Sequence, residues 1–204
     1  MPTIAEDLRQ IHAAAVRATV DLVAHATPDD LTRPTPCARW DLAALLGHMT
    51  AQHHGFAAAA HGRGADLTVW TPTRPDADFL HRYAEATTAV LDAFAPADVL
   101  DRPFDLPELS TDRTFPGHLA LRFHLVDYVV HGWDVATTLS LPYAPGPDTL
   151  AATLPIARAV PDGPTRLTPD AAFAPAHPVL PGTDPLTEIL LLLGRHPSRP
   201  GASA

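Results

Sequence analysis

Four side chains able to bind a metal or transfer a proton occur in one apolar segment, "FHLVDYVVHGWDVA". They are His124, Asp127, His131 and Asp134, spaced three, four and three residues apart. On a helix this spacing places them within an arc of roughly 80°. A solvated helix face usually carries Glu, Lys, Arg or Gln, whereas Asp and His are weaker helix formers. We therefore interpret this stripe as a site of ligation or proton transfer, with the solvent side of a core helix as the alternative.

Asp127 and His131 lie one helical turn apart, so their donor atoms can converge on one point. A His from a neighbouring helix would complete a three-ligand site, and His48 in "GHMTAQHHGF" lies beside the apolar face of its segment. His124 is the competing third ligand. Two nitrogens and one oxygen with open positions are typical of a catalytic divalent ion. We expect Zn, with Ni, Fe or Mn as alternatives.

Other residues are expected to support this site. Asp134 can accept an imidazole N–H behind the ligands, and His124 is the alternative in that place. Gln52, His53 and Trp133 are candidate substrate contacts, and His53 is expected at the surface or at a cleft edge rather than as a ligand. No protein nucleophile is predicted, because serine is scarce and no G-x-S-x-G motif occurs. The expected nucleophile is a metal-bound thiolate or water, and no catalytic residue is assigned.

Apolar periodicity and prolines define the elements that must position these residues. Strand signals are scarce. The expected helices cover residues 3–26, 42–60, 79–95, 117–140, 148–160 and 185–196. Residues 98–116 are expected to be irregular or briefly extended, and residues 161–183 mostly irregular with a short strand. The predicted fold is all-α, with residues 1–142 as an up-and-down four-helix bundle. Residues 143–204 are expected to pack on it as a small helical extension within a single structural unit.

Composition excludes several classes of function. The 204 residues carry a net charge of −9, and the 14 basic residues are all scattered Arg, which argues against nucleic-acid binding. The single Cys37 and the N-terminus "MPTIAEDLRQ" predict a cytoplasmic protein. No apolar run is long enough to span a membrane. The expected partner is a small-molecule substrate, and the chain is expected to be a monomer or homodimer.

Three motifs resemble a known family. "PTPCARWDLAALLGHM", "HLVDYVVHGWDVATTLSLP" and the ending "PLTEILLLLGRHP" are similar to stretches of an actinobacterial metal-binding family of the DinB-like superfamily. That family is related to the N-terminal domain of mycothiol-dependent maleylpyruvate isomerase. The resemblance extends from near residue 1 to about residue 197 and implies a four-helix bundle. It also implies the metal ligands His48, Asp127 and His131, although the isomerase has Glu at the position of Asp127.

The resemblance implies thiol chemistry. A metal-bound thiolate, with mycothiol as co-substrate, would attack a small electrophilic or natural-product substrate. Thiol transfer and isomerisation share this first step, so an enzyme of the thiol S-transferase or isomerase type is expected. Two alternatives remain open. One is a metal-dependent hydrolase or lyase that uses metal-bound water, and the other is a bundle that binds a metal or small ligand without turnover.

Overall fold

The computed structural model describes residues 7–37, 40–168 and 171–197. It confirms the predicted all-α class, since helices dominate and the only sheet in these ranges has two short strands. The chain divides into two compact units, residues 1–144 and 145–204. The predicted packing of the C-terminal residues on the bundle stays a prediction.

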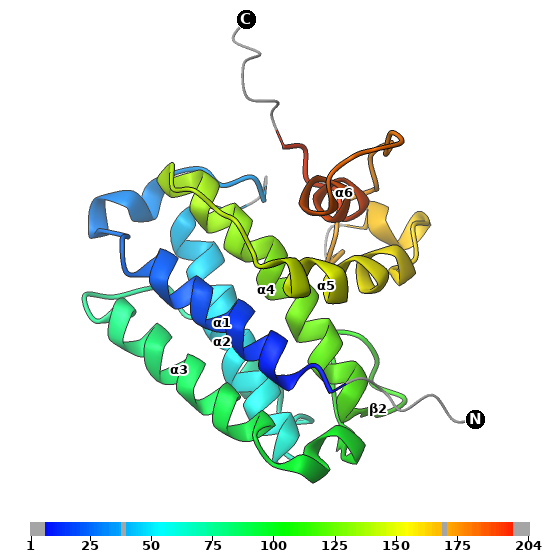
Figure 1. The fold of residues 1–204 in the computed structure, drawn as a ribbon. Coiled ribbons are helices and arrows are strands. Elements are labelled where there is room, and N and C mark those ends of the chain that lie inside the picture. The colour runs from blue at the N-terminus through cyan, green and yellow to red at the C-terminus, as the bar shows by residue number, and fades with distance from the viewer. Residues whose placement is uncertain (1–6, 38–39, 169–170, 198–204) are drawn as a thin grey trace, which may run out of the picture. The chain divides into compact units, whose positions relative to one another are not determined.

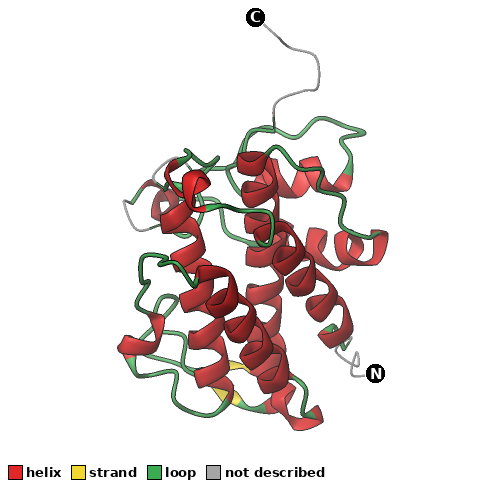
Figure 2. Cartoon of the chain, turned by 90° about the vertical axis from the view of Figure 1, so that its left-hand side faces the viewer, coloured by secondary structure: helices red, strands yellow, loops and turns green. Residues whose placement is uncertain are grey.

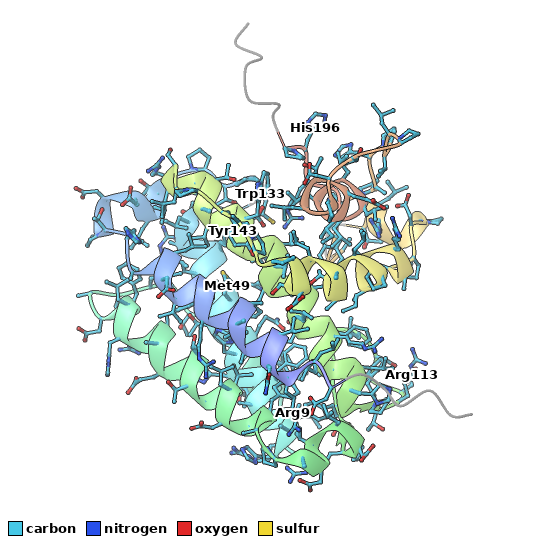
Figure 3. All side chains as sticks on the ribbon, viewed as in Figure 1. Arg9, Met49, Arg113, Trp133, Tyr143 and His196 are labelled. Atoms are coloured by element: carbon cyan, nitrogen blue, oxygen red, sulfur yellow. The ribbon has the colours of Figure 1, made fainter. Side chains whose placement is uncertain are left out.

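Four helices build the first unit, and they lie side by side (Figure 1). Helices α1 and α2 each pack against both α3 and α4. Met49 of α2 is fully buried and lies in the interior of this unit (Figure 3). The helices are α1 (Arg9–Val23), α2 (Leu42–Ala60), α3 (Phe79–Phe94) and α4 (Gly117–Leu139).

Helix α2 begins where the sequence predicts. Asp41 is its N-cap, and the side chain accepts a hydrogen bond from the Ala44 backbone N–H at 2.8 Å. A bridge between Pro34 and Asp41 closes the preceding turn and brings the chain into the helix. The cap therefore fixes the register of α2, including His48.

Two glycines of α2 let a connecting segment lie directly on the helix. A Cβ at Gly47 would meet the Thr73 carbonyl oxygen at 2.6 Å, and one at Gly55 would overlap the Trp70 ring. Trp70 ends a 3₁₀ turn, η2 (Leu67–Trp70), and its indole donates to the Gly64 carbonyl. The connection between α2 and α3 thus covers the outer face of α2, which leaves most of this helix buried.

A short antiparallel pair closes the other long connection. Strand β1 (Pro103–Phe104) pairs with β2 (Phe115–Pro116), and both appear as the small yellow segments of Figure 2. This is the extended piece that the sequence predicts for residues 98–116. It follows the 3₁₀ turn η3 (Ala97–Asp101) and fixes both ends of the loop formed by residues 105–114. An earlier 3₁₀ turn, η1 (Pro28–Thr32), links α1 to the approach to α2.

Helix α4 is held from outside by the segment that follows it. Ser140 at its C-cap adopts a left-handed conformation, with φ of 59°. Tyr143 then returns to donate a hydrogen bond to the Val129 carbonyl at 2.9 Å. Its ring lies over Gly132, where a Cβ would be 2.8 Å from the hydroxyl. This contact fastens the part of α4 that carries His131.

The second unit contains α5 (Pro147–Ala159), the 3₁₀ turn η4 (Pro164–Leu167) and α6 (Pro185–Leu192). Buried Arg166 connects its segments by donating to the carbonyls of Pro161, Val160, Ala174 and Leu192. No strand forms within residues 161–168 and 171–183, so the predicted short strand is wrong for these residues.

The helix ends differ modestly from the predicted ones. Helix α1 begins at Arg9, and residues 3–6 of the expected helix lie outside the described residues. Gly194 lies just beyond α6 with φ of +74°, the left-handed backbone conformation in which glycine commonly ends a helix. In the described ranges, no helix has both the length and the apolar character needed to cross a membrane.

Candidate metal centre

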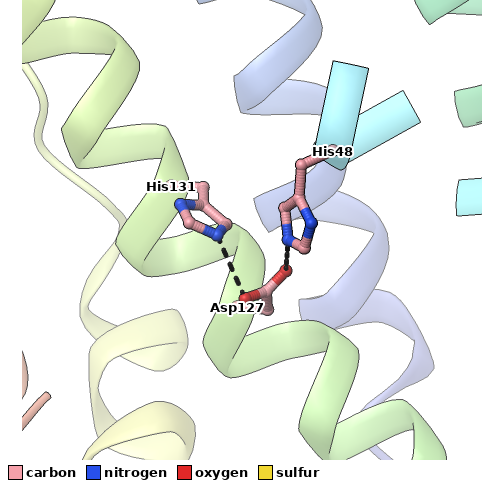
Figure 4. A group of neighbouring side chains, drawn as sticks. All are labelled: His48, Asp127 and His131. Atoms are coloured by element: carbon pink, nitrogen blue, oxygen red, sulfur yellow. Dashed lines mark ion pairs between the residues drawn. The ribbon is translucent and has the colours of Figure 1, made fainter. Parts of the chain in front are cut away.

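His48, Asp127 and His131 meet where α2 packs on α4 (Figure 4). Each offers one ligand atom, and these atoms all lie within 4.8 Å of one another. The i, i+4 spacing of Asp127 and His131 on α4 aligns their side chains on one face, as the sequence predicts. His48 enters from α2, 79 residues before Asp127 in the chain, and this brings the predicted triad together.

Both imidazoles direct the same ring atom at the carboxylate. His131 Nε2 lies 3.3 Å from Asp127 Oδ1, and His48 Nε2 lies 3.9 Å from Asp127 Oδ2. The two rings are 5.2 Å apart and nearly perpendicular, at 76°. The site therefore presents two nitrogens and a carboxylate toward a common point.

Asp134 orients His131 from behind. Its Oδ2 lies 2.9 Å from His131 Nδ1, and the Asp134 side chain is fully buried. A buried carboxylate here accepts the Nδ1–H of the imidazole, which leaves Nε2 as the ring nitrogen that faces Asp127 and His48. This is the hydrogen bond expected from the spacing of the α4 stripe.

The carboxylates of Asp127 and Asp134 favour a positive charge at this site. Burial acts to lower the pKa of His131, but the charges and hydrogen bonds of Asp127 and Asp134 outweigh it and raise that pKa to about 9. A buried cluster with excess negative charge is stabilised by a proton or by a cation. A divalent ion supplies the same compensation.

The residues fit a divalent metal ion by their donor types and their access. Imidazole nitrogen and carboxylate oxygen suit zinc and other first-row ions. The side chains of His48 and Asp127 keep 18% and 21% exposure, whereas that of His131 keeps 4%. Three protein ligands with one solvent-facing side match a site that keeps positions open for exogenous ligands, rather than a closed structural site.

Trp40 is part of this site, and the sequence analysis missed it. Its ring lies 4.6 Å from the His48 ring and 5.9 Å from the His131 ring. The turn before α2 holds it in place, because the Trp40 backbone N–H donates to the Cys37 carbonyl at 2.8 Å. The one available signal was its position directly before the Asp41 cap, on the same helix end as His48.

Gln52 and Glu108 meet one helical turn beyond His48. Gln52 is buried, and its Nε2 donates to Glu108 Oε2 at 2.9 Å. Gln52 is one of the predicted substrate contacts, whereas Glu108 was not predicted, since nothing in the spacing of residues 52 and 108 indicates contact. The pKa of Glu108 is raised, because desolvation of its carboxyl and the charge of Asp127 both act in that direction. The hydrogen bond from Gln52 lowers the pKa but does not outweigh them.

His124 lies in a separate buried cluster. Its Nδ1 is 2.9 Å from Nε2 of His12, and its ring stacks on Tyr128 with centroids 4.1 Å apart. His48, rather than His124, is the residue that the structure brings to Asp127 and His131. The four polar residues of the α4 stripe therefore divide: Asp127 and His131 belong to the triad, Asp134 supports His131, and His124 lies in the core.

His53 and Trp133 complete the set of predicted site residues. His53 is fully buried with Nε2 bonded to the Thr87 hydroxyl, so the expectation that it lies at the surface or at a cleft edge is wrong. Trp133 is half-buried on α4, two residues after His131. The roles of Gln52, His53 and Trp133 as substrate contacts stay predictions.

A separate surface hollow of about 810 Å³ lies over α2, η2 and α3. It is lined by His54 of α2, by His61 at the C-cap of α2 and by Arg82 and Glu85 of α3, and none of the triad residues line it. Its imidazoles are exposed and belong to no group of potential metal ligands among the described residues. The convergence of three potential ligands therefore favours the triad as the functional site.

The chain is similar to known proteins over most of its length. The chain is 28% identical over 184 residues to an uncharacterised protein of Mycobacterium tuberculosis, in strains CDC 1551 / Oshkosh and ATCC 25618 / H37Rv. The match covers 90% of this chain and 95% of that protein. No solved structure matches the chain. The sequence model described as mycothiol maleylpyruvate isomerase N-terminal domain matches residues 12–136, which include the whole triad. The chain therefore belongs to the mycothiol maleylpyruvate isomerase N-terminal domain family.

Proposed function

We propose that this protein is a metal-dependent enzyme that uses mycothiol to transfer a thiol to, or to isomerise, a small electrophilic or natural-product substrate. The observation that carries the proposal is the convergence of His48, Asp127 and His131 within a family described by its mycothiol-dependent isomerase. In this proposal the four helices of the first unit form the DinB-like bundle that carries the centre.

His48, Asp127 and His131 would hold the ion, with zinc expected first and Ni, Fe or Mn sharing the same donor preferences. When bound, such an ion lowers the pKa of a thiol, so that the nucleophile is an anion at neutral pH. Asp127 has one methylene fewer than the Glu expected at this position of the isomerase. The close packing of α2 on α4 is compatible with this shorter reach, since all three ligand atoms already lie within 4.8 Å.

The surrounding residues fix the ligands and shape access. Asp134 sets the orientation of His131 through the 2.9 Å contact with Nδ1. Trp40 covers the ring of His48 and shields that side from water. Substrate and thiol would approach from the side on which His48 and Asp127 are exposed.

The position of the single cysteine favours a nucleophile that is not part of the protein. Its one cysteine, Cys37, is three residues before Trp40 in the turn that leads to α2 and is not among the grouped ligands. A small thiol that enters the exposed side would meet the ligand set directly. This arrangement favours a thiol co-substrate over a covalent protein intermediate.

The test is to titrate mycothiol into the cobalt-substituted protein and to record the thiolate-to-cobalt absorption band. A saturable band, absent in His48→Ala, is the expected result. Stoichiometric cobalt without a band would overturn thiol chemistry and favour water as the nucleophile, in a hydrolase or lyase. A protein that binds the metal but converts no electrophile in the presence of mycothiol would instead be a binding protein.

A further inference from the structure

Glu108 is held beside the candidate metal centre by a contact that joins distant parts of the chain. Its Oε2 accepts a hydrogen bond from Gln52 Nε2 at 2.9 Å, across 56 residues of sequence. Gln52 is only 5% exposed and lies four residues after His48, so both side chains project from the same side of α2. The buried Gln52 amide therefore holds the carboxylate of Glu108, a loop residue, one helical turn of α2 from the candidate ligand His48.

The loop that carries Glu108 is anchored on both sides. Phe104 of β1 and Leu106 are buried, at 0% and 2% exposure, and the pairing of Phe104 with Phe115 closes the loop at its base. The backbone N–H groups of Leu109 and Ser110 both donate to the Leu106 carbonyl. This turn holds Glu108 in place, while the residue itself remains exposed to solvent.

The environment of Glu108 differs from that of the other acidic groups at the centre. Asp127 is a candidate ligand, and Asp134 is bonded to the ligand His131. Glu108 instead has Gln52 of α2 as its hydrogen-bond partner and Asp127 of α4 as the charge that acts on it. Because desolvation and Asp127 both raise its pKa, Glu108 accepts a proton more readily than an ordinary surface carboxylate.

We propose that Glu108, positioned by Gln52, is the proton-transfer residue of this centre, accepting the proton of the incoming thiol and returning it to the product. In the first step the S–H bond breaks, the proton moves to a Glu108 carboxylate oxygen, and the sulfur keeps the electron pair. In the second step a C–S bond forms, the π electrons of the electrophile move to its acceptor atom, and that atom takes the proton from Glu108. The sum is addition of thiol to electrophile, with no oxidant or reductant.

This inference rests on the proposed thiol function, but its placement of Glu108 can be tested without turnover. The chain has four glutamates, Glu6, Glu85, Glu108 and Glu188. Protein labelled with carbon-13 at the glutamate δ-carbon therefore gives few signals, and Glu108→Gln identifies one of them. The Glu108 signal should titrate at higher pH than the others, and Asp127→Asn should lower its midpoint. A midpoint equal to the others and insensitive to Asp127→Asn would overturn the placement.

The role in proton transfer is tested by stopped-flow mixing of the cobalt-substituted protein with mycothiol. General acid–base catalysis is typically worth about 100-fold or more in rate. Glu108→Gln should slow the appearance of the thiolate-to-cobalt band by about 100-fold, with cobalt content and final amplitude unchanged. Glu85→Gln, at an exposed carboxylate of α3, is the matched control and should react at the wild-type rate.

The two proposals fail in different ways. A normal band that forms at the wild-type rate in Glu108→Gln would overturn only the role of Glu108. No band in the wild-type protein would overturn the thiol function itself, and the carbon-13 titration would still report whether Glu108 lies under the influence of Asp127.

Discussion

The Nδ1 atom of His131 lies 2.9 Å from Oδ2 of Asp134, within a helix turn that is closed to solvent. Loss of such a partner typically weakens metal binding by about 10- to 100-fold. Asp134→Asn should therefore raise the dissociation constant for zinc by this factor, measured by competition with a chromophoric chelator. Asp92→Asn, at an exposed carboxylate of α3, should leave it unchanged. Equal zinc affinities for Asp134→Asn and Asp92→Asn would show that Asp134 does not support metal binding.

The fluorescence of Trp40 should report whether an ion is bound at the candidate metal centre. Its ring lies 4.6 Å from that of His48, so a paramagnetic ion bound to His48 would lie close to the indole. Among the three tryptophans of the chain, Trp40 should contribute the largest share of fluorescence quenching by Co²⁺. Trp40→Phe should remove that share, whereas Trp133→Phe should retain it. Full quenching in Trp40→Phe would place the ion elsewhere.

Gly55 allows the η2 segment to lie against α2. Because a Cβ there would overlap the Trp70 ring, Gly55→Ala should lower the free energy of unfolding by about 1–3 kcal/mol. Gly146→Ala adds a methyl group in open space and should change it by about 0.5 kcal/mol or less. Chemical denaturation measures both. If Gly55→Ala is as stable as the wild type, the close packing of Trp70 on α2 is wrong.

His12 should make the fold sensitive to acid. Burial lowers the pKa of His12 to about 3, from an ordinary value of 6.5, and the group faces the buried imidazoles of His124 and His53. Between these two pH values the unfolded chain binds more protons at this residue than the folded chain does. The contribution of neutral His12 to stability is thus complete above pH 6.5 and decreases as the pH falls toward 3.

The measurement is the free energy of unfolding as a function of pH, for the wild type and His12→Gln. The variant keeps a hydrogen-bonding side chain but has no group that titrates, so its stability should fall less steeply below pH 6.5. Identical slopes for the two proteins would show that His12 is not held neutral in the folded state.

Local chemistry explains why the helices were predictable. Asp41 caps α2 and the prolines after Leu141 end the helical pattern of α4, and both signals lie within a few residues of the boundary they determine. The Asp127 and His131 pair was predictable for the same reason, since helical geometry alone brings positions i and i+4 together. His48 was one of two third ligands that the spacing left open, and the family resemblance favoured it.

Contacts between distant segments account for what was missed. Glu108 reaches Gln52 across 56 residues, and His12 meets His124 across 112. His53 was expected at the surface or at a cleft edge, yet α3 and α4 bury it, with Thr87 at Nε2 and Tyr128 stacked at 4.2 Å. Such contacts depend on how the helices pack, which local sequence patterns do not encode.

The most direct test of the central claim is the metal content of the purified protein, compared between the wild type, His48→Ala and His54→Ala. His48 is one of the three grouped ligands, and His54 is an exposed imidazole on the same helix. Elemental analysis should give about one divalent ion per chain for the wild type and His54→Ala, and a small fraction of that for His48→Ala, with unchanged helical circular dichroism. Full occupancy in His48→Ala, or no ion in any of the three, would contradict a metal centre at His48, Asp127 and His131.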